Sequence, residues 1–230
     1  MPSPYWLLRS TYLLLPEKLR LWPPLKRLSQ RVVSTVASHE DIYTAEYYQR
    51  DVEGPARCAA PVISASIMRD FNPRRVVDLG CGTGALLEAL KNHGCDCQGF
   101  EYSDSGLALC RSRGLHVAKF DIEHDSIPSQ LGKFDVALST EVAEHLPARC
   151  ADRFVDVLAS LAPVIVLTAA TPGQGGTDHV NEQPHEYWIE KLKARGYQYE
   201  LSRSQNWRWA WESAGIADFY YRNVMVFQRG

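Results

Sequence analysis

An acidic residue followed by three evenly spaced glycines is the stretch of this chain best suited to binding a ligand. Asp78 precedes Gly80, Gly82 and Gly84 in D-L-G-C-G-T-G. Glycines let a backbone approach a ligand closely, and the N-terminus of a following helix offers unpaired N–H groups. A carboxylate two residues before the first glycine suits a ligand that carries a positive charge.

Two further acids follow the next two apolar segments. Glu101 ends the segment Cys97–Ser103, and Asp121 ends the segment His116–Ile122. An acid about 20 residues beyond the first glycine is where an α/β nucleotide site needs an acceptor for ribose hydroxyls, which fits Glu101. Because the carboxyl ends of parallel strands meet at one edge of a sheet, we expect the three acids to converge on one crevice.

A second group of reactive side chains follows the fourth apolar segment, Lys133–Thr140. The stretch E-V-A-E-H places Glu141, Glu144 and His145 on one face if the chain turns helically there. Two carboxylates and an imidazole that point together are plausible ligands for Mg²⁺, Mn²⁺ or Zn²⁺. Without a metal, His145 or His179 of the later loop would serve as a base or contact a substrate. Acids near a helix start are also favourable through the helix dipole alone, so both interpretations stay open.

Strands that alternate with helices must position these residues. The predicted strands are Val76–Asp78, Cys97–Ser103, His116–Ile122, Lys133–Thr140 and Val164–Ala169, with a closing pair at Tyr197–Leu201 and Asn223–Gln228. Helices are predicted at Ser105–Arg113, after Pro147 and at His185–Arg195. This alternation predicts an α/β fold, a Rossmann-like, doubly wound, mainly parallel seven-stranded sheet with helices on both faces. The spacing of Trp207, Trp209 and Trp211 fits strand-like alternation at least as well as a platform for a ligand.

The motif D-L-G-C-G-T-G resembles the first motif of the class I S-adenosylmethionine-dependent methyltransferases. The resemblance covers roughly residues 43–228 and implies S-adenosylmethionine as the cofactor. It also implies that Asp121, the acid expected to end the third strand, accepts a hydrogen bond from the adenine amino group. The cofactor-binding residues expected on this basis are Asp78, Gly80, Cys81, Gly82, Gly84, Glu101, Tyr102, Asp121, Ile122 and Thr140.

The stretch E-V-A-E-H-L looks like the E-x-x-E-H segment of ubiquinone-pathway O-methyltransferases and of small-RNA 2′-O-methyltransferases. In the RNA group a later histidine completes a metal site, and His179 in T-D-H-V is its match here. The resemblance therefore implies Glu141, Glu144, His145 and His179 as ligands of a metal such as Mg²⁺, which would lower the pKa of an acceptor hydroxyl. The candidate catalytic residues are His145, His179 and Glu141.

The predicted activity is methylation of a hydroxylated small molecule, such as a sugar or a natural-product intermediate. The polar, glycine-hinged loop G-G-T-D-H-V-N-E-Q-P suits such an acceptor. A small amine and an RNA 2′-hydroxyl are the alternatives, and nucleic acid is disfavoured because phosphate binding needs a basic groove. Gly80-x-Gly82-x-x-Ala85 also matches the dinucleotide fingerprint, but Asp78 argues against a nicotinamide-dependent oxidoreductase. Three ligand-facing acids argue against a catalytically silent binding domain.

Composition bounds the remaining expectations. The chain has 230 residues, 45% hydrophobic and 23% charged, with a net charge of −2, as is ordinary for a globular protein.

Residues 1–72 are expected to form an N-terminal helical cap and residues 73–230 one integrated core. Residues 1–38 carry six basic side chains and one acid, so they are expected to pack as a lid or to contact a membrane surface. No apolar run reaches the ~20 residues of a membrane span. Six cysteines without a C-x-x-C pair favour a reducing, cytoplasmic compartment.

Overall fold

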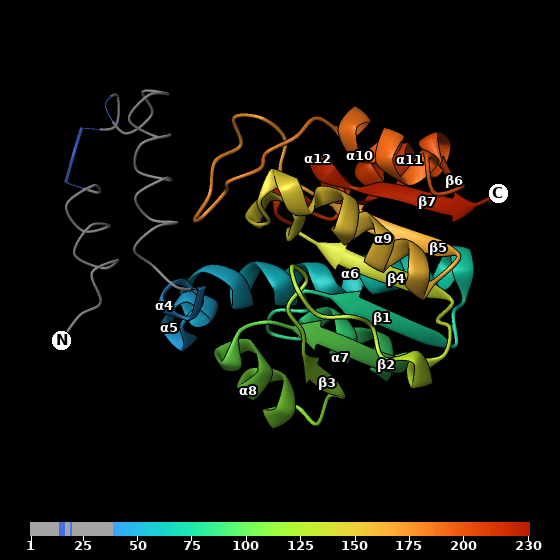
Figure 1. The fold of residues 1–230 in the computed structure, drawn as a ribbon, viewed down its shortest axis with the longest axis horizontal. Coiled ribbons are helices and arrows are strands. Elements are labelled where there is room, and N and C mark those ends of the chain that lie inside the picture. Colours follow the sequence, from blue (N-terminus) through green and yellow to red (C-terminus); the bar gives the residue numbers. More distant parts are fainter. Residues whose placement is uncertain (1–13, 17–18, 20–38) are drawn as a thin grey trace.

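The computed structural model describes residues 14–16, 19 and 39–230 (Figure 1). Its strands are β1 (Arg75–Leu79), β2 (Asp96–Glu101), β3 (Val117–Lys119), β4 (Val136–Thr140), β5 (Val164–Thr168), β6 (Tyr197–Tyr199) and β7 (Met225–Arg229). The described helices are α4 (His39–Ile42), α5 (Ala45–Tyr47), α6 (Glu53–Phe71), α7 (Ala85–Asn92), α8 (Asp104–Ser112), α9 (Ala151–Leu161), α10 (His185–Lys193), α11 (Leu201–Ser213) and α12 (Asp218–Asn223). Short turns are the π-helix η1 (Tyr48–Val52) and the 3₁₀ turns η2 (Ser129–Leu131), η3 (Ala143–His145) and η4 (Ala148–Cys150).

The strands form one seven-stranded sheet in the order β3-β2-β1-β4-β5-β7-β6. Strands β1 to β5 pair in parallel, and β7 pairs antiparallel with both β5 and β6. The chain runs outward from β1 to β3 and then returns to β4 on the other side of β1, so the order of strands reverses between β1 and β4. A ligand crevice is expected beyond the carboxyl ends of strands at such a reversal. The predicted Rossmann-like, mainly parallel seven-stranded sheet is confirmed.

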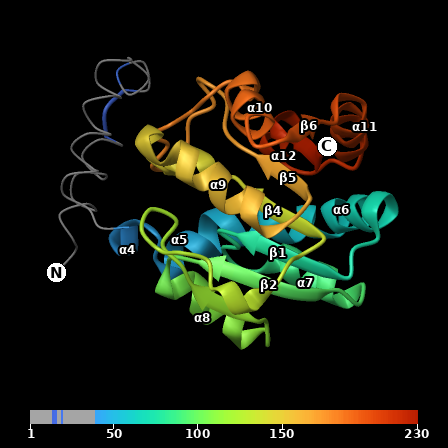
Figure 2. The ribbon, with the colours of Figure 1, turned by 45° about the vertical axis from the view of Figure 1, so that its right-hand side comes forward.

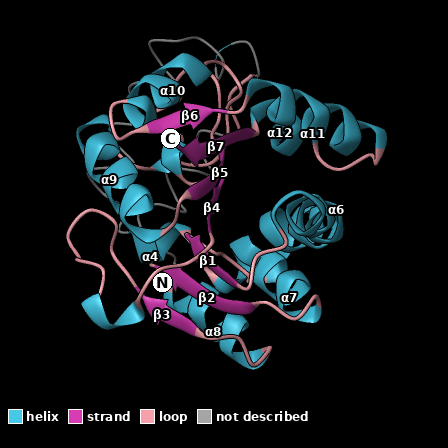
Figure 3. Ribbon diagram, turned by 90° about the vertical axis from the view of Figure 1, so that its right-hand side faces the viewer, coloured by secondary structure: helices cyan, strands magenta, loops and turns pink. Residues whose placement is uncertain are grey.

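Helices cover both faces of the sheet (Figure 3). Helices α9 and α10 lie on one face, whereas α6, α7, α11 and α12 pack on the other. Strand β5 shows why its first four residues are all apolar. Ile165 and Leu167 point into the cluster under α9 and α10, while Val164 and Val166 point into the opposite cluster. A strand that is buried on both sides has no solvent face to make polar.

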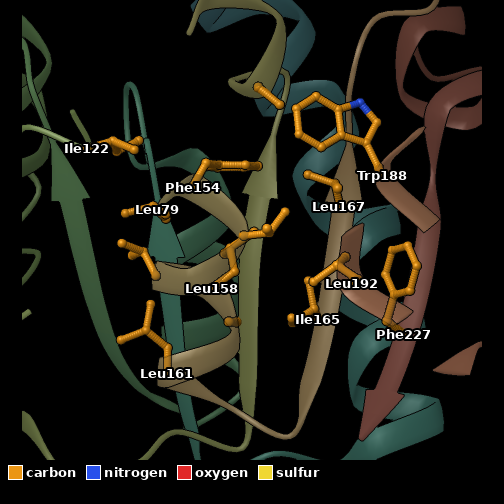
Figure 4. Close-up of a cluster of buried hydrophobic side chains, with 14 of the residues drawn as sticks. Leu79, Ile122, Phe154, Leu158, Leu161, Ile165, Leu167, Trp188, Leu192 and Phe227 are labelled. Carbon is orange, nitrogen blue, oxygen red and sulfur yellow. The ribbon is translucent and has the colours of Figure 1, made fainter. Parts of the chain in front are cut away.

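An apolar cluster fills the space between the sheet and helices α9 and α10 (Figure 4). Phe154 and Leu158 of α9 and Trp188 of α10 are fully buried against the strands. The Phe154 and Trp188 rings meet edge to face with their centroids 5.8 Å apart. Such contacts between large buried rings hold the two helices in a fixed relation to the strand ends.

The strand-like interpretation of the three closely spaced tryptophans is wrong, because α11 is helical across all of them. Trp207 and Trp211 lie one helical turn apart and are completely buried, whereas Trp209 on the other side of the helix is 72% exposed. The Trp211 indole N–H donates to Ser66 Oγ at 2.9 Å. Packing against α6 therefore decides the conformation of this segment. The two-residue spacing of the tryptophans along the sequence could not reveal this packing.

Two predicted element boundaries are also corrected. Strand β6 ends at Tyr199, and Leu201 begins α11 instead of ending a strand. Asn223 is the last residue of α12, and β7 begins at Met225. The Asn223 side chain is completely buried, so it faces the interior from the end of a helix.

The described part of the N-terminal region packs on the body of the protein. Ile63 and Ile67 of α6 are buried in the same cluster as Val76 of β1 and Trp207 of α11. The lid and membrane-surface predictions for residues 1–38 fall outside the described residues, apart from residues 14–16 and 19. The division of the chain into a cap of residues 1–72 and a core of residues 73–230 stays a prediction. In the part of the chain that the structure describes, every helix is too short or too polar to cross a membrane.

Candidate active site

A cavity of about 660 Å³ opens at the carboxyl ends of β1, β2 and β4. The arrowheads of β1 and β4 point toward α4 and α5, and the loop of residues 171–184 extends to the same side (Figures 1 and 2). The cavity lies where the order of strands reverses, as expected for a ligand crevice. Nine of the ten expected cofactor-binding residues line it, namely Asp78, Gly80, Cys81, Gly82, Glu101, Tyr102, Asp121, Ile122 and Thr140.

Gly84 is the expected cofactor residue that does not line the cavity. It precedes α7 with a φ of 76°, and a Cβ at this position would lie 2.5 Å from Leu115 Cδ1 and 2.8 Å from Cys110 Sγ. Its role is therefore to turn the chain against α8. Gly80 has a φ of 81°, and a Cβ there would lie 2.5 Å from Val142 Cγ2. Glycine is needed at both positions for the turn to close.

Asp78 is a buried carboxylate at the end of β1, with 2% of its surface exposed. Its Oδ1 atom has no hydrogen-bond partner among the described residues. Burial, with a smaller contribution from the Glu101 carboxylate, raises the pKa of Asp78 to about 7. A buried carboxylate without a donor is costly, and a cationic donor on a ligand would offset that cost.

Glu101 is fixed by three donors at the end of β2. Its Oε2 atom accepts from the backbone N–H of Gly82 at 2.8 Å, and Oε1 accepts from the N–H of Ser103 at 2.8 Å. The Tyr48 hydroxyl donates to Oε1 at 3.3 Å. Burial raises the pKa of Glu101 against the opposing effect of these hydrogen bonds. Tyr48, in the π-helical turn η1, is a site residue that the sequence patterns did not single out.

Asp121 lies at the far end of the cavity in the turn after β3, which ends at Lys119, so the prediction that Asp121 ends the strand is wrong. Its Oδ1 atom accepts from the N–H of Glu123 at 2.8 Å, and Oδ2 lies 2.8 Å from Nδ1 of His124. These contacts shape the turn that follows Asp121 and hold Ile122 beside it on the cavity wall. The three acids expected at strand ends thus share one cavity.

Glu141 lies at the other end of the cavity. Its backbone conformation is unusual, with a φ of 54°. Its N–H donates to Thr168 Oγ1 at 2.9 Å. Its carboxylate accepts from Gln174 Nε2 and from Asn223 Nδ2, each at 3.1 Å. Left-handed backbone at a residue other than glycine is strained and persists where surrounding contacts enforce it. These contacts hold Glu141 at the cavity wall.

The expectation that Glu141, Glu144 and His145 share one helical face is corrected. The left-handed turn at Glu141 separates it from the 3₁₀ turn that begins at Ala143. Ligand atoms of Glu144, His145 and His179 instead lie within 4.8 Å of one another. Glu144 is completely buried, and neither of its carboxyl oxygens has a hydrogen-bond partner among the described residues. Burial, together with the nearby Glu141 carboxylate, raises the pKa of Glu144 well above its usual range.

The two histidines meet at the cavity wall. The imidazole centroids of His145 and His179 are 4.9 Å apart and the rings are nearly perpendicular. Nδ1 of His145 lies 3.3 Å from the carbonyl oxygen of Asp178. Tyr43 packs edge-on against His145 with centroids 5.9 Å apart, and its hydroxyl donates to Asp178 Oδ2 at 3.4 Å. The segment before η1 and the loop of residues 171–184 therefore contact each other beside the histidines.

A family model described as a methyltransferase domain matches residues 48–219 of the chain. Ubiquinone biosynthesis O-methyltransferases are among its relatives. The protein from Methylococcus capsulatus is 42% identical over 79 residues, which is 32% of this chain and 33% of that protein. The protein from Bordetella avium is 34% identical over 80 residues, again 32% of this chain and 33% of the relative. The aligned stretch spans about a third of these relatives.

Solved structures of similar shape include two methyltransferases. Magnesium protoporphyrin IX methyltransferase from Synechocystis with bound S-adenosylhomocysteine has a TM-score of 0.59 and 17% identity, covering 93% of this chain and 97% of that one. An amino pentose methyltransferase from Micromonospora echinaspora has a TM-score of 0.58 and 18% identity, covering 80% of this chain and 96% of that one. At these identities the similarity shows the fold.

Proposed function

The chain belongs to the methyltransferase domain family, and on this premise we propose that it transfers a methyl group from S-adenosylmethionine to a hydroxyl group of a small molecule. The observation that carries the proposal is that one cavity joins the acids Asp78, Glu101 and Asp121 to a pair of imidazoles. The acids are suited to a cationic nucleoside cofactor, and the imidazoles are suited to accept the proton of a hydroxyl.

The cofactor half of the cavity would hold S-adenosylmethionine, which supplies an electrophilic methyl group. Asp78 would accept from its ammonium group, because the buried Oδ1 atom lacks a donor. Glu101 would accept from ribose hydroxyls at the end of β2, and Asp121 with Ile122 would contact the adenine. The fixed hydrogen bonds of Glu101 support this assignment, since a carboxylate that is already oriented loses little freedom on binding.

The acceptor half would hold the hydroxyl beside His145 and His179. Methyl transfer is an in-line displacement, so the acceptor oxygen must be positioned and must lose its proton. Glu141, fixed by Gln174 and Asn223, would accept a hydrogen bond from a second polar group of the acceptor. The ubiquinone O-methyltransferases among the relatives support an oxygen acceptor.

The charge of the cavity wall favours an acceptor without phosphate or carboxylate. Of the described residues that line it, the acids are Asp51, Asp78, Glu101, Asp121, Glu123 and Glu141. Arg149 is the lining residue with a guanidinium or ammonium group, and it pairs with Glu123 at 2.8 Å. A phosphodiester chain would meet net negative charge here, which argues against RNA as the acceptor.

N-methylation of a small amine is the second candidate. The same acidic wall favours it, because Glu141 would pair with an ammonium group of the acceptor. The two candidates need the same cofactor and differ in the atom methylated, so product analysis separates them.

A divalent metal is the remaining part of the site prediction. Glu144, His145 and His179 would hold it, and there it would lower the pKa of an acceptor hydroxyl. The donor set has two nitrogens and one carboxyl group, which suits Zn²⁺ or Mn²⁺ more than Mg²⁺. Glu141 does not belong to this group of ligand atoms. The predicted four-residue site for Mg²⁺, Mn²⁺ or Zn²⁺ stays a prediction, three of its four residues form this group, and the proposed reaction does not depend on a metal.

Calorimetric titration with S-adenosylmethionine, S-adenosylhomocysteine and NADH tests the proposal. We expect micromolar binding of the first two and none of the third. Screening hydroxylated and amino acceptors by mass spectrometry should then detect the gain of a methyl group. Binding of NADH alone, or no methylated product from a broad neutral and cationic panel, would contradict the proposal.

A further inference from the structure

One face of α8 packs against the glycine turn and against the acid that ends β2. Gly106 and Cys110 lie one helical turn apart on α8, and Arg113 follows directly after the helix. A Cβ at Gly106 would lie 2.9 Å from Cγ of Glu101 and 3.0 Å from the carbonyl oxygen of Gly82. The Cys110 thiol donates to the same Gly82 oxygen at 3.3 Å. This face of the helix therefore contacts both partners of the hydrogen bond that orients Glu101.

Arg113 extends these contacts to the start of α6. Its Nη1 atom donates to the carbonyl oxygen of Thr83 at 2.5 Å, and its Nη2 atom donates to Oε1 of Glu53. The Arg113 and Glu53 side chains are 15% and 23% exposed, so water competes little with this ion pair. Nη1 of Arg57 lies 3.5 Å from the same Glu53 oxygen, but the Arg57 side chain is 61% exposed and such pairs contribute little. The planar guanidinium of Arg113 thus binds two acceptors in fixed directions, which a lysine ammonium does not.

The two segments joined by this guanidinium carry donors to Glu101. Thr83 directly follows Gly82, whose N–H donates to Oε2 of Glu101. Glu53 directly follows the π-helical turn η1, in which the Tyr48 hydroxyl donates to Oε1 of Glu101. The guanidinium therefore fixes the positions from which both hydrogen bonds are made.

We infer that Arg113 and Glu53 are positioning residues for the cofactor, which hold the Glu101 carboxylate in the orientation that accepts from the ribose hydroxyls. The inference rests on the proposed function, because the ribose contact of Glu101 is part of it. Neither Arg113 nor Glu53 lines the cavity, so both act through the glycine turn and η1. A carboxylate that is fixed before binding loses less conformational freedom when the ligand arrives. Removing the ion pair should therefore weaken the part of the binding that comes from the ribose hydroxyls and leave the rest.

Calorimetry with two ligands that differ in the ribose hydroxyls tests this inference. The wild type should bind S-adenosylhomocysteine roughly 10- to 100-fold more tightly than its 2′,3′-dideoxy analogue. Arg113→Ala should weaken the binding of S-adenosylhomocysteine about tenfold and the binding of the analogue less than about twofold. Arg57→Ala removes an exposed cation beside the same carboxylate and is the matched control, with both affinities unchanged. Equal losses for the two ligands in Arg113→Ala would show a general loss of packing and would overturn the inference.

A double-mutant cycle and a conservative variant complete the test. Glu53→Ala combined with Arg113→Ala should weaken S-adenosylhomocysteine binding no more than Arg113→Ala alone, because both changes remove the same contact. Arg113→Lys keeps the charge and should keep the Tm, but it should weaken S-adenosylhomocysteine binding at least about threefold. With an acceptor found in the screen, its KM for S-adenosylmethionine should rise while kcat changes less than about twofold. Additive losses in the cycle, or wild-type affinity of Arg113→Lys, would overturn the inference. A wild type that binds neither ligand would instead contradict the proposed function itself.

Discussion

The Oε2 atom of Glu101 accepts a hydrogen bond from the backbone N–H of Gly82 at 2.8 Å, which ties the end of β2 to the glycine turn after β1. The bond joins two residues that sequence patterns had assigned to the same ligand separately. This bond fixes the acid relative to the turn. The charged acceptor therefore serves both the local fold and the proposed ribose contact.

Replacing Glu101 by alanine should weaken S-adenosylmethionine binding roughly 10- to 100-fold, because hydrogen bonds to a charged group contribute about 1.5–3 kcal/mol. Calorimetry with S-adenosylhomocysteine measures the loss without turnover. Glu190→Ala on the exposed side of α10 is the matched control. Equal affinity of Glu101→Ala and the wild type would remove Glu101 from the cofactor site.

Cofactor affinity should rise with pH in the range where Asp78 ionises. Burial, and to a smaller degree Glu101, raises the pKa of Asp78 to about 7, so at pH 6 most molecules carry a neutral carboxyl group there. An ammonium ligand binds the carboxylate form, so the association constant should increase up to about 16-fold from pH 5.5 to 7, about twofold more by pH 8, and level off above that. Calorimetry across this range tests it. Asp78→Asn should bind weakly with a flat profile, and a steep profile in this variant would assign the effect to another group.

Stability of the ligand-free protein should change in the opposite sense. The folded-state pKa of Asp78 is raised above its unfolded value of about 3.9, so the folded form holds this proton more tightly. The resulting stability is fully present below pH ~4 and is lost as the pH rises through about 7. The Tm of the wild type should therefore fall more between pH 5 and 8 than that of Asp78→Asn. Parallel Tm curves for the two proteins would contradict the pKa assigned to Asp78.

The sequence predicted those features that depend on neighbouring residues. The acids at strand ends could be found because each follows an apolar run, and the parallel sheet could be inferred from alternation. Contacts between distant segments could not be found in this way. Asn223 meets Glu141 across 82 positions, and Tyr48 reaches Glu101 across 53. Asn223 was also assigned to a strand, which hid the helix end that directs it inward.

The sequence also did not predict the backbone conformation at Glu141, and the reason is local. An E-x-x-E-H stretch on a helix would place both acids on one helical face. The Glu141 carboxylate does lie near Glu144, but the backbone at Glu141 is left-handed and the 3₁₀ turn begins only at Ala143. Thr168 on the neighbouring strand β5 holds the Glu141 N–H in this conformation. Sequence spacing carries no signal for a strained residue that tertiary contacts enforce.

The three tryptophans of α11 should differ sharply in their effect on stability. Trp211→Ala removes a fully buried ring and its hydrogen bond to Ser66, and should cost about 3–5 kcal/mol. Trp209→Ala removes a ring that is 72% exposed and should change stability by less than about 0.5 kcal/mol. Urea unfolding of both variants measures the contrast. Similar losses for the two would fit a strand, in which both side chains share one face, and would contradict the helix.

Zinc should inhibit methyl transfer, whereas magnesium should neither inhibit nor be required. Zn²⁺ suits the imidazoles of His145 and His179 with the Glu144 carboxyl group, and binding there would occupy the histidines needed for the proton. Mg²⁺ prefers oxygen ligands, and Glu141, the second acid, is engaged by Gln174 and Asn223. The activity of chelator-treated protein should fall at least tenfold when Zn²⁺ is added in slight molar excess over the protein, and it should return with EDTA. His145→Gln should weaken Zn²⁺ binding measured by calorimetry, while Glu141→Gln should leave it unchanged. Activity that is lost with EDTA and restored by Mg²⁺ would instead establish the four-residue metal site.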